Sequence, residues 1–307
     1  MTREPAGARL GRVIVAMATP FDPDGALDLA GAEALAAALV AEGNEGLVVS
    51  GSTGEASVLD DRERLELWRC VARAVDVPVL AGSTSNDTRH SVELTAAAAG
   101  CGVAGILAVV PYYNRPAQAG LEAHFRAVAA ATELPVVLYD IPVRTGRKLA
   151  TETVLRLAEG VENVVGLKDA AADVAATARL LAAAPDDFVC WSGDDALTLP
   201  FLSVGAIGVI SVISHWAAPE VVAMIRAFLD GDLAGALALQ RRLLQSFAFL
   251  SSDAAPNPVP TKAMLRVLGL PGGQCRLPLG DAPSDLEDQA KAVLAELETA
   301  RRAGAGS

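Results

Sequence analysis

The lysine at the end of one apolar segment is the residue of this sequence whose position most clearly suggests a catalytic role. Lys168 closes the run 164–167 and precedes Asp169. Burial at the end of a strand lowers the pKa of an ammonium group, and the free amine can then attack a ketone. Position alone leaves two other interpretations open: a side chain that extends into solvent, or an ion pair with Asp169.

Other polar residues follow similar apolar runs. Tyr139 ends the run 135–139, and its phenol could pass protons during carbinolamine formation and dehydration; the alternative is a core tyrosine with a satisfied hydroxyl. The glycines of Gly51–Glu55 let the backbone approach a small carboxylate closely, although the segment could be an ordinary turn before a helix. For Asp194 and Asp195 we favour the N-cap and first turn of a helix.

The elements that must position these residues follow one recurring pattern. Up to about residue 230, a short β-branched run is followed by a polar or Gly-rich loop and then by an Ala/Leu-rich helical segment. Eight strands are expected, at Val13–Ala18, Gly46–Ser50, Pro78–Gly82, Gly105–Val110, Pro135–Tyr139, Val164–Lys168, Phe188–Ser192 and Ile207–Ser211. Eight α/β units predict a (β/α)8 TIM barrel. A doubly wound sheet is less favoured, because no G-x-G-x-x-G follows the first strand.

The strand signal stops after Gly231. Three further helices are expected, at Asp232–Leu250, Pro258–Leu268 and Pro283–Arg302. We therefore predict a barrel over residues 1–230 and a small C-terminal helical extension over residues 231–307, packed on the barrel.

Composition narrows the class of protein. The formal charge is −12 and basic clusters are absent, so nucleic acid and anionic membrane surfaces are improbable partners. The four cysteines form no C-x-x-C pair, which favours buried thiols in a reducing compartment. The first residues lack a signal-peptide pattern, and both long uncharged stretches are broken by Gly or Pro. We expect a soluble, cytoplasmic protein.

Seven motifs carry a family resemblance. The sequence resembles the dihydrodipicolinate synthase / N-acetylneuraminate lyase superfamily, and most closely its dihydrodipicolinate synthase branch, from about Val13 to Leu279. The motifs are GSTGE at Gly51–Glu55, PYYNRP at Pro111–Pro116, LYDIPVRTG at Leu138–Gly146, GLKDA at Gly166–Ala170, SGDD at Ser192–Asp195, GVISV at Gly208–Val212 and NPVPTK at Asn257–Lys262.

The resemblance implies a role for each site residue. Lys168 would form an imine with pyruvate, Tyr139 would transfer protons, and Thr53 and Tyr113 would complete a hydroxyl relay, with Tyr113 reaching in from a neighbouring subunit of a homotetramer. The backbone N–H groups of Ser52 and Thr53 would hold the pyruvate carboxylate. Further implied site residues are Arg144, which would bind the carboxylate of the second substrate, and Gly193 and Ile210, which would line the site.

The implied reaction is the condensation of pyruvate with L-aspartate 4-semialdehyde to 4-hydroxy-tetrahydrodipicolinate, in lysine and diaminopimelate biosynthesis. This lyase would need no metal and no organic cofactor. Two other functions are open. A related enzyme could cleave N-acetylneuraminate or a 2-keto-3-deoxy sugar acid, although Arg144 suits a short carboxylated aldehyde better. A non-catalytic barrel could bind a keto acid, although it would need no proton relay.

Some positions depart from the family pattern. Ser52 replaces the usual threonine, and Asp140 stands where many members carry asparagine. At the site where some members bind lysine as a feedback inhibitor, His90 replaces a glutamate, and Asp61 and Arg64 replace histidines. Asn86 and Tyr112 are retained there. Without that carboxylate the site should hold the ammonium groups of lysine poorly, so we predict weak or absent inhibition by lysine.

Overall fold

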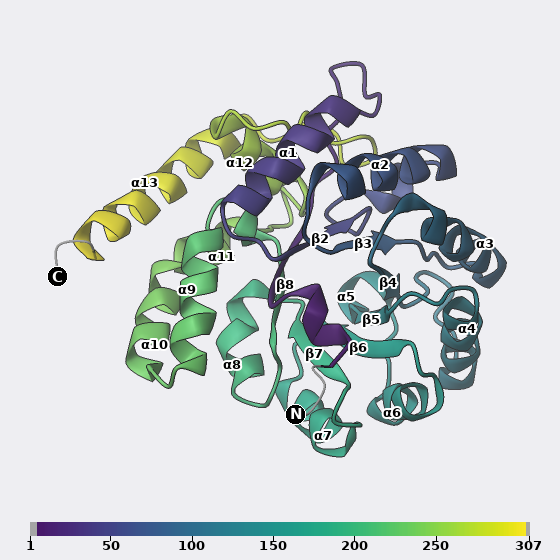
Figure 1. Cartoon of the computed structure of the whole chain (residues 1–307). Coiled ribbons are helices and arrows are strands. Elements are labelled where there is room, and N and C mark those ends of the chain that lie inside the picture. Colours follow the sequence, from purple (N-terminus) through teal and green to yellow (C-terminus); the bar gives the residue numbers. More distant parts are fainter. Residues whose placement is uncertain (1–4, 305–307) are drawn as a thin grey trace.

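A closed barrel of eight parallel strands forms the centre of the molecule (Figure 1). The computed structural model describes residues 5–304. Each strand pairs with the next, and the last strand pairs with the first. The strands are β1 (Val13–Ala16), β2 (Gly46–Val49), β3 (Val79–Gly82), β4 (Gly105–Val109), β5 (Val136–Asp140), β6 (Val164–Asp169), β7 (Val189–Ser192) and β8 (Gly208–Ser211). The expected barrel is confirmed, and each strand lies within two residues of its expected bounds.

Helices surround the barrel on its outer side. They are α1 (Leu29–Ala41), α2 (Asp61–Ala74), α3 (Thr88–Ala98), α4 (Gln118–Ala130), α5 (Pro142–Thr145), α6 (Thr151–Gly160), α7 (Val174–Ala183) and α8 (Thr198–Leu202). Local signals explain their starts: the side chain of Asp60 caps α2 in a reciprocal capping box with Glu63, and Asp28 caps α1. The short helix α5 was not expected from the sequence.

Five more helices follow the barrel unit of β8. They are α9 (Ala218–Leu229), α10 (Leu233–Arg242), α11 (Leu244–Phe249), α12 (Val259–Val267) and α13 (Leu286–Gly304). The single helix expected at 232–250 is divided into α10 and α11. Apolar side chains of α9 and of α11–α13 share one buried cluster with Val13 of β1 and Val209 of β8. The C-terminal helices are therefore joined to the barrel by a common core.

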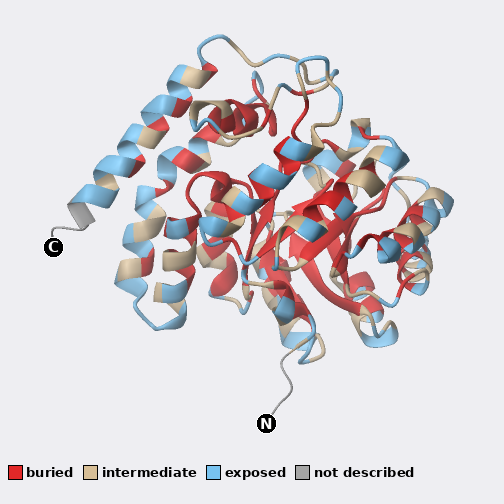
Figure 2. Ribbon diagram, turned by 45° about the horizontal axis from the view of Figure 1, so that its top comes forward, coloured by how far each residue is buried: buried red, intermediate tan, exposed pale blue. Residues whose placement is uncertain are grey.

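Apolar side chains from all eight strands form a buried cluster inside the barrel. Figure 2 shows the strands at the centre as buried. Tyr139 of β5 and Lys168 of β6 are register partners, and the next pair is Asp140 and Asp169. Because side chains alternate along a strand, the first pair faces the interior and the second faces the helices. The register thus brings the predicted lysine and tyrosine side by side near the carboxyl ends of their strands.

Within residues 5–304, none of the helices has both the length and the apolar character that crossing a membrane requires. The thiols of Cys70, Cys101, Cys190 and Cys275 are free and buried.

Candidate active site

Lys168 is buried beside the ring of Tyr139. Lys168 is only 4% exposed, and its Nζ lies 4.4 Å from the centroid of the Tyr139 ring. Burial lowers the pKa of the ammonium group from 10.5 to about 8, the charge of Asp195 opposes this shift, and that of Arg144 adds to it. The amine is therefore far more often neutral near pH 8 than an ordinary lysine.

The alternative pairing of Lys168 with Asp169 does not occur. The carboxylate of Asp169 accepts hydrogen bonds from the Ala171 backbone N–H at 2.8 Å and from the Thr177 hydroxyl at 2.6 Å. Asp169 faces α7 and Lys168 faces the interior, because they are neighbours on one strand. The amine is therefore not held by the carboxylate next to it in sequence.

The hydroxyl of Tyr139 contacts Ser52. Burial raises the pKa of Tyr139, and a hydrogen bond with the Ser52 side chain opposes this rise. The Thr53 hydroxyl has a different partner, since its Oγ1 accepts a hydrogen bond from Nδ2 of Asn257 at 2.9 Å. Ser52 and Tyr139 line the same pocket and Thr53 does not, so the geometry favours Ser52, one residue before the expected Thr53, as the hydroxyl next to Tyr139.

The turn at 51–55 has the properties of an anion-binding nest. The residues at its two edges, Ser50 and Glu55, both have left-handed backbone conformations, with φ of 54° and 53°. Within the part of the chain described, the backbone N–H groups of Ser52 and Thr53 donate to no protein acceptor. Two adjacent N–H groups in such a turn suit a carboxylate.

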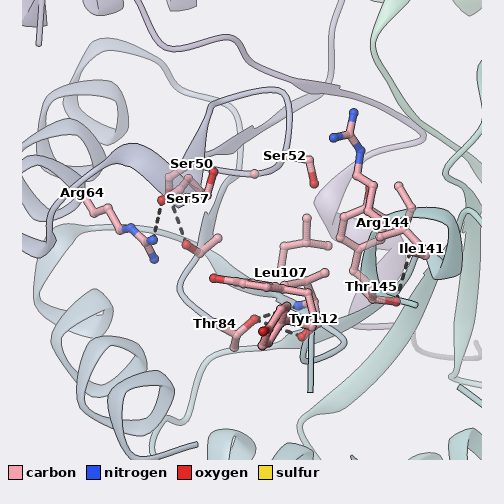
Figure 3. A pocket seen from close by; sticks show the side chains of 16 residues that line it. Ser50, Ser52, Ser57, Arg64, Thr84, Leu107, Tyr112, Ile141, Arg144 and Thr145 are labelled. Atoms are coloured by element: carbon pink, nitrogen blue, oxygen red, sulfur yellow. Dashed lines mark hydrogen bonds between the residues drawn. The ribbon is translucent and has the colours of Figure 1, made fainter. Parts of the chain in front are cut away.

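A pocket of about 390 Å³ opens from these residues. Figure 3 shows Ser52 between two arginines, with Arg64 on one side of the pocket and Arg144 on the other. Of the predicted site residues, Ser52, Tyr113, Tyr139 and Arg144 line it. The other four predicted residues do not line the pocket: Lys168, Thr53, Gly193 and Ile210. Lys168 contacts the ring of Tyr139, which does. A volume of this size accommodates small organic acids.

The remaining predicted residues lie at the edges of this arrangement. Ile210 packs in the barrel interior with Tyr139. The backbone N–H of Gly193 donates to the carbonyl of Asp169 at 2.7 Å. Arg144 lies on α5, and its guanidinium donates to the backbone carbonyl of Asn257 at 2.9 Å. This bond holds the guanidinium of an exposed arginine at the pocket mouth.

Tyr113 projects from the chain. Its side chain is 89% exposed, and its backbone has a φ of 72°, in the left-handed region. A positive φ is rare for a bulky residue and costs free energy, so such a conformation is unusual where no contact of the side chain compensates for it. Within this one chain it lines the outer wall of the pocket but has no buried contacts.

The two aspartates after β7 have different roles. Asp194 is the N-cap of a short 3-10 helix and accepts a hydrogen bond from the Ala196 N–H at 3.0 Å, as expected. Asp195 crosses to the end of β8, where its carboxylate accepts from the Ser211 hydroxyl at 2.5 Å and from the Val212 N–H at 2.8 Å. Asp195 lies in the first turn of the 3-10 helix as expected, and the structure adds its bond to Ser211 at the end of the next strand.

At the outer end of the pocket, Arg64 is only 5% exposed and burial lowers the pKa of its guanidinium. One of its nitrogens donates to the carbonyl of Ala56 at 2.5 Å. His90 is engaged by Asp61 at 2.8 Å and by the Ser85 hydroxyl at 3.2 Å. This end of the pocket therefore carries a buried cation.

Comparison with known proteins places this site in context. Residues 9–297 match the model of the dihydrodipicolinate synthetase family. The 4-hydroxy-tetrahydrodipicolinate synthase of Moorella thermoacetica is 49% identical over 288 residues, which cover 93% of this chain and 98% of that protein.

Solved structures of dihydrodipicolinate synthases also match this chain. The dihydrodipicolinate synthase of Cyanidioschyzon merolae with lysine bound is 44% identical, with a TM-score of 0.92 over 94% of this chain and 99% of that one. The chloride-inhibited enzyme of Acinetobacter baumannii complexed with pyruvate is 34% identical, with a TM-score of 0.89 over 94% and 99% of the two chains. The extent of the match and the level of identity show that this chain belongs to the dihydrodipicolinate synthetase family.

Proposed function

We propose that this protein is a lyase that condenses pyruvate with L-aspartate 4-semialdehyde to give 4-hydroxy-tetrahydrodipicolinate, a step of lysine and diaminopimelate biosynthesis. The observation that carries the proposal is the buried Lys168, whose pKa is lowered to about 8 and whose Nζ lies 4.4 Å from the centroid of the Tyr139 ring. An amine of this kind, in contact with a tyrosine that lines the same pocket as Ser52 of the 51–55 turn, suits a small 2-oxo acid.

In the first half-reaction, the neutral amine of Lys168 attacks the ketone of pyruvate. The carbinolamine loses water, and Tyr139 exchanges protons with the reacting atoms through its hydroxyl. Ser52, which hydrogen-bonds Tyr139, is the next hydroxyl of this relay. The backbone N–H groups of Ser52 and Thr53 bind the pyruvate carboxylate, and the imine then loses a methyl proton to give an enamine.

In the second half-reaction, the enamine carbon attacks the aldehyde. Arg144, exposed at the pocket mouth, binds the carboxylate of the semialdehyde, because its planar guanidinium matches a carboxylate. The amine of the bound product then cyclises onto the imine carbon and displaces Lys168. Gly193 and Ile210 complete the walls around the imine. No step of this sequence calls on a metal ion or an organic cofactor.

We also infer that Tyr113 contacts a second copy of the chain, in a homotetramer built from two tight dimers. The exposed fraction of 89% and the strained backbone of Tyr113 support this inference, since a partner chain would cover the ring. Sedimentation analysis of the purified protein tests it. A monomer at micromolar concentration would contradict it.

The imine is tested by reduction with borohydride. Pyruvate and borohydride together should add the mass of a reduced pyruvyl group to the peptide that contains Lys168, and Lys168→Ala should abolish the addition. Borohydride alone is the control. Absence of labelling in the wild-type protein would contradict catalysis through Lys168 and favour a keto-acid-binding barrel.

The second substrate is tested separately. Turnover with aspartate semialdehyde and pyruvate should greatly exceed cleavage of N-acetylneuraminate or of 2-keto-3-deoxy sugar acids. Arg144→Met should raise the KM for the semialdehyde and leave labelling by pyruvate largely intact. Faster turnover of a sugar acid would replace this substrate assignment while retaining the imine.

A further inference from the structure

The turn at 51–55 is held from outside the barrel unit that contains it. Three contacts join it to the segment 257–276 near the C-terminus. Asn257 Nδ2 donates to Thr53 Oγ1 at 2.9 Å, and Nζ of Lys262 lies 2.6 Å from Oε1 of Glu55. The backbone N–H of Arg276 donates to Oε2 of Glu55 at 2.9 Å. The turn is thus held at Thr53 and at Glu55 by a part of the chain that lies about 200 residues later in the sequence.

The amide of Asn257 is itself held in one orientation. The hydroxyl of Thr261 donates to Asn257 Oδ1 at 2.9 Å, which directs Nδ2 toward Thr53. Asn257 is 8% exposed, Thr53 3% and Thr261 is fully buried, so water does not compete effectively for these bonds. The backbone carbonyl of Asn257 also accepts from Arg144 at 2.9 Å.

The turn needs such support because its backbone is strained and crowded. Ser50 and Glu55 occupy left-handed conformations that cost side-chain-bearing residues free energy. A Cβ added to Gly54 would lie 3.0 Å from the Met17 carbonyl oxygen and 3.1 Å from Ser50, so the backbone has little room to relax in place. Strained conformations persist where neighbouring structure fixes them more firmly than the local sequence does.

We propose that Asn257 is a positioning residue for pyruvate binding, which acts through Thr53. Its amide holds the Thr53 side chain and so keeps the free N–H groups of Ser52 and Thr53 directed at the substrate carboxylate. This inference rests on the proposed function, in which this turn binds pyruvate. It makes the C-terminal segment part of the pyruvate site.

Asn257→Ala removes the donor to Thr53 and leaves the backbone carbonyl that holds Arg144. We expect the KM for pyruvate to rise about tenfold, the change that loss of one buried hydrogen bond produces. The kcat should change by less than about threefold, and the KM for aspartate semialdehyde should stay near the wild-type value. A fall in kcat with an unchanged KM for pyruvate would overturn the proposal.

A double-mutant cycle separates positioning through Thr53 from a general structural role. Thr53→Val deletes the acceptor and should raise the KM for pyruvate by a similar factor. The variant with both Asn257→Ala and Thr53→Val should show no larger rise than the more affected single variant. Thr53→Ser, which restores Oγ, should recover most of the pyruvate affinity lost in Thr53→Val. Independent, multiplying effects of the two changes would overturn the proposal.

Asn163→Ala is a matched control. This asparagine also donates from Nδ2 to backbone carbonyls, of Ala129 at 3.0 Å and of Thr132 at 2.8 Å, but it precedes β6 at the amino end of the strand. It should lose stability without a change in the KM for pyruvate. If Asn257→Ala does not fold, Asn257→Leu, which removes the amide and keeps a side chain of similar size, tests the same bond.

Borohydride labelling distinguishes failure of this proposal from failure of the proposed function. The pyruvate concentration that gives half-maximal labelling of Lys168 requires no second substrate. A total lack of labelling in the wild-type protein would refute the imine. Labelling with the same half-maximal concentration in the wild type, Asn257→Ala and Thr53→Val would refute the positioning role and leave the imine standing.

Discussion

The lowered pKa of Lys168 predicts a specific pH dependence for imine formation. With a pKa of about 8, about half of the amine is neutral at pH 8; a lysine at the ordinary value of 10.5 would have only about one molecule in 300 neutral there. This lowering of the pKa corresponds to about 3 kcal/mol. This free energy comes from burial, which penalises the ammonium form more than the amine.

The rate of imine formation should follow the neutral fraction of Lys168. At a fixed, subsaturating pyruvate concentration, the rate should rise about 50-fold between pH 6 and pH 8 and then level off. Rapid mixing with pyruvate, followed by borohydride quenching and mass measurement at each pH, gives this rate directly. Stability of the fold across the range is checked by circular dichroism.

Two variants test the electrostatic origin with opposite signs. The Asp195 carboxylate favours the charged lysine, so Asp195→Asn should move the midpoint to lower pH. The Arg144 guanidinium disfavours it, so Arg144→Met should move the midpoint to higher pH. A wild-type midpoint near 10, or shifts of both variants in the same direction, would refute the reasoning from burial and neighbouring charge.

Four further predictions follow from other contacts. Burial raises the pKa of Asp140 from 3.8 to about 7, so the free-energy penalty for ionising it in the folded state grows between about pH 4 and pH 7. Asp140→Asn should therefore raise the free energy of unfolding, measured by denaturant titration, by up to about 4 kcal/mol at pH 8 and hardly at pH 4. Equal gains at both pH values would contradict this origin. Lys262→Met leaves the Glu55 carboxylate buried without its partner and should lower the free energy of unfolding by about 3–5 kcal/mol in the same titration. Adding Glu55→Gln should restore much of this stability. No recovery would exclude the uncompensated charge as the cause. Free lysine should inhibit turnover weakly or not at all, because the pocket presents the buried cation of Arg64 to its ammonium groups, and a micromolar inhibition constant would contradict this. Tyr113→Phe should slow turnover and leave pyruvate labelling largely intact; unchanged turnover would argue against a relay through that hydroxyl.

Much of the fold could be predicted because its signals are local. Each βα unit repeats within about 30 residues, and the bounds of the strands depend on short apolar runs bordered by Gly, Pro or polar residues. The short helix α5 escaped prediction because it has a single turn, although Pro142 begins it and Gly146 ends it. The division of 232–250 into α10 and α11 escaped prediction because the sequence has no Gly or Pro at Leu243. Closure of eight such units then places all eight strand ends around one mouth.

The assignment of hydroxyl roles could not be predicted in the same way. Ser52 and Thr53 are adjacent, chemically alike and in one motif, so the sequence offers no means to decide which of them faces Tyr139. In the structure, Thr53 is turned toward Asn257, and Ser52 is the hydroxyl of this pair that lines the pocket together with Tyr139. The motif that contains Asn257 was visible in the sequence, but its partner was not.

The sequence by itself determined the barrel, the place of Lys168 at the end of β6 and its neighbour Tyr139, because strand order and the two-residue alternation of side chains are local properties. Only the tertiary structure decided that Lys168 is free of Asp169, that Asp195 bonds to the end of β8, and that a segment about 200 residues away holds the 51–55 turn. The first two contacts span only 8 and 16 residues, but they depend on how the chain folds back from the strand ends. The third joins residues 204 apart and forms only when the C-terminal segment packs against the barrel.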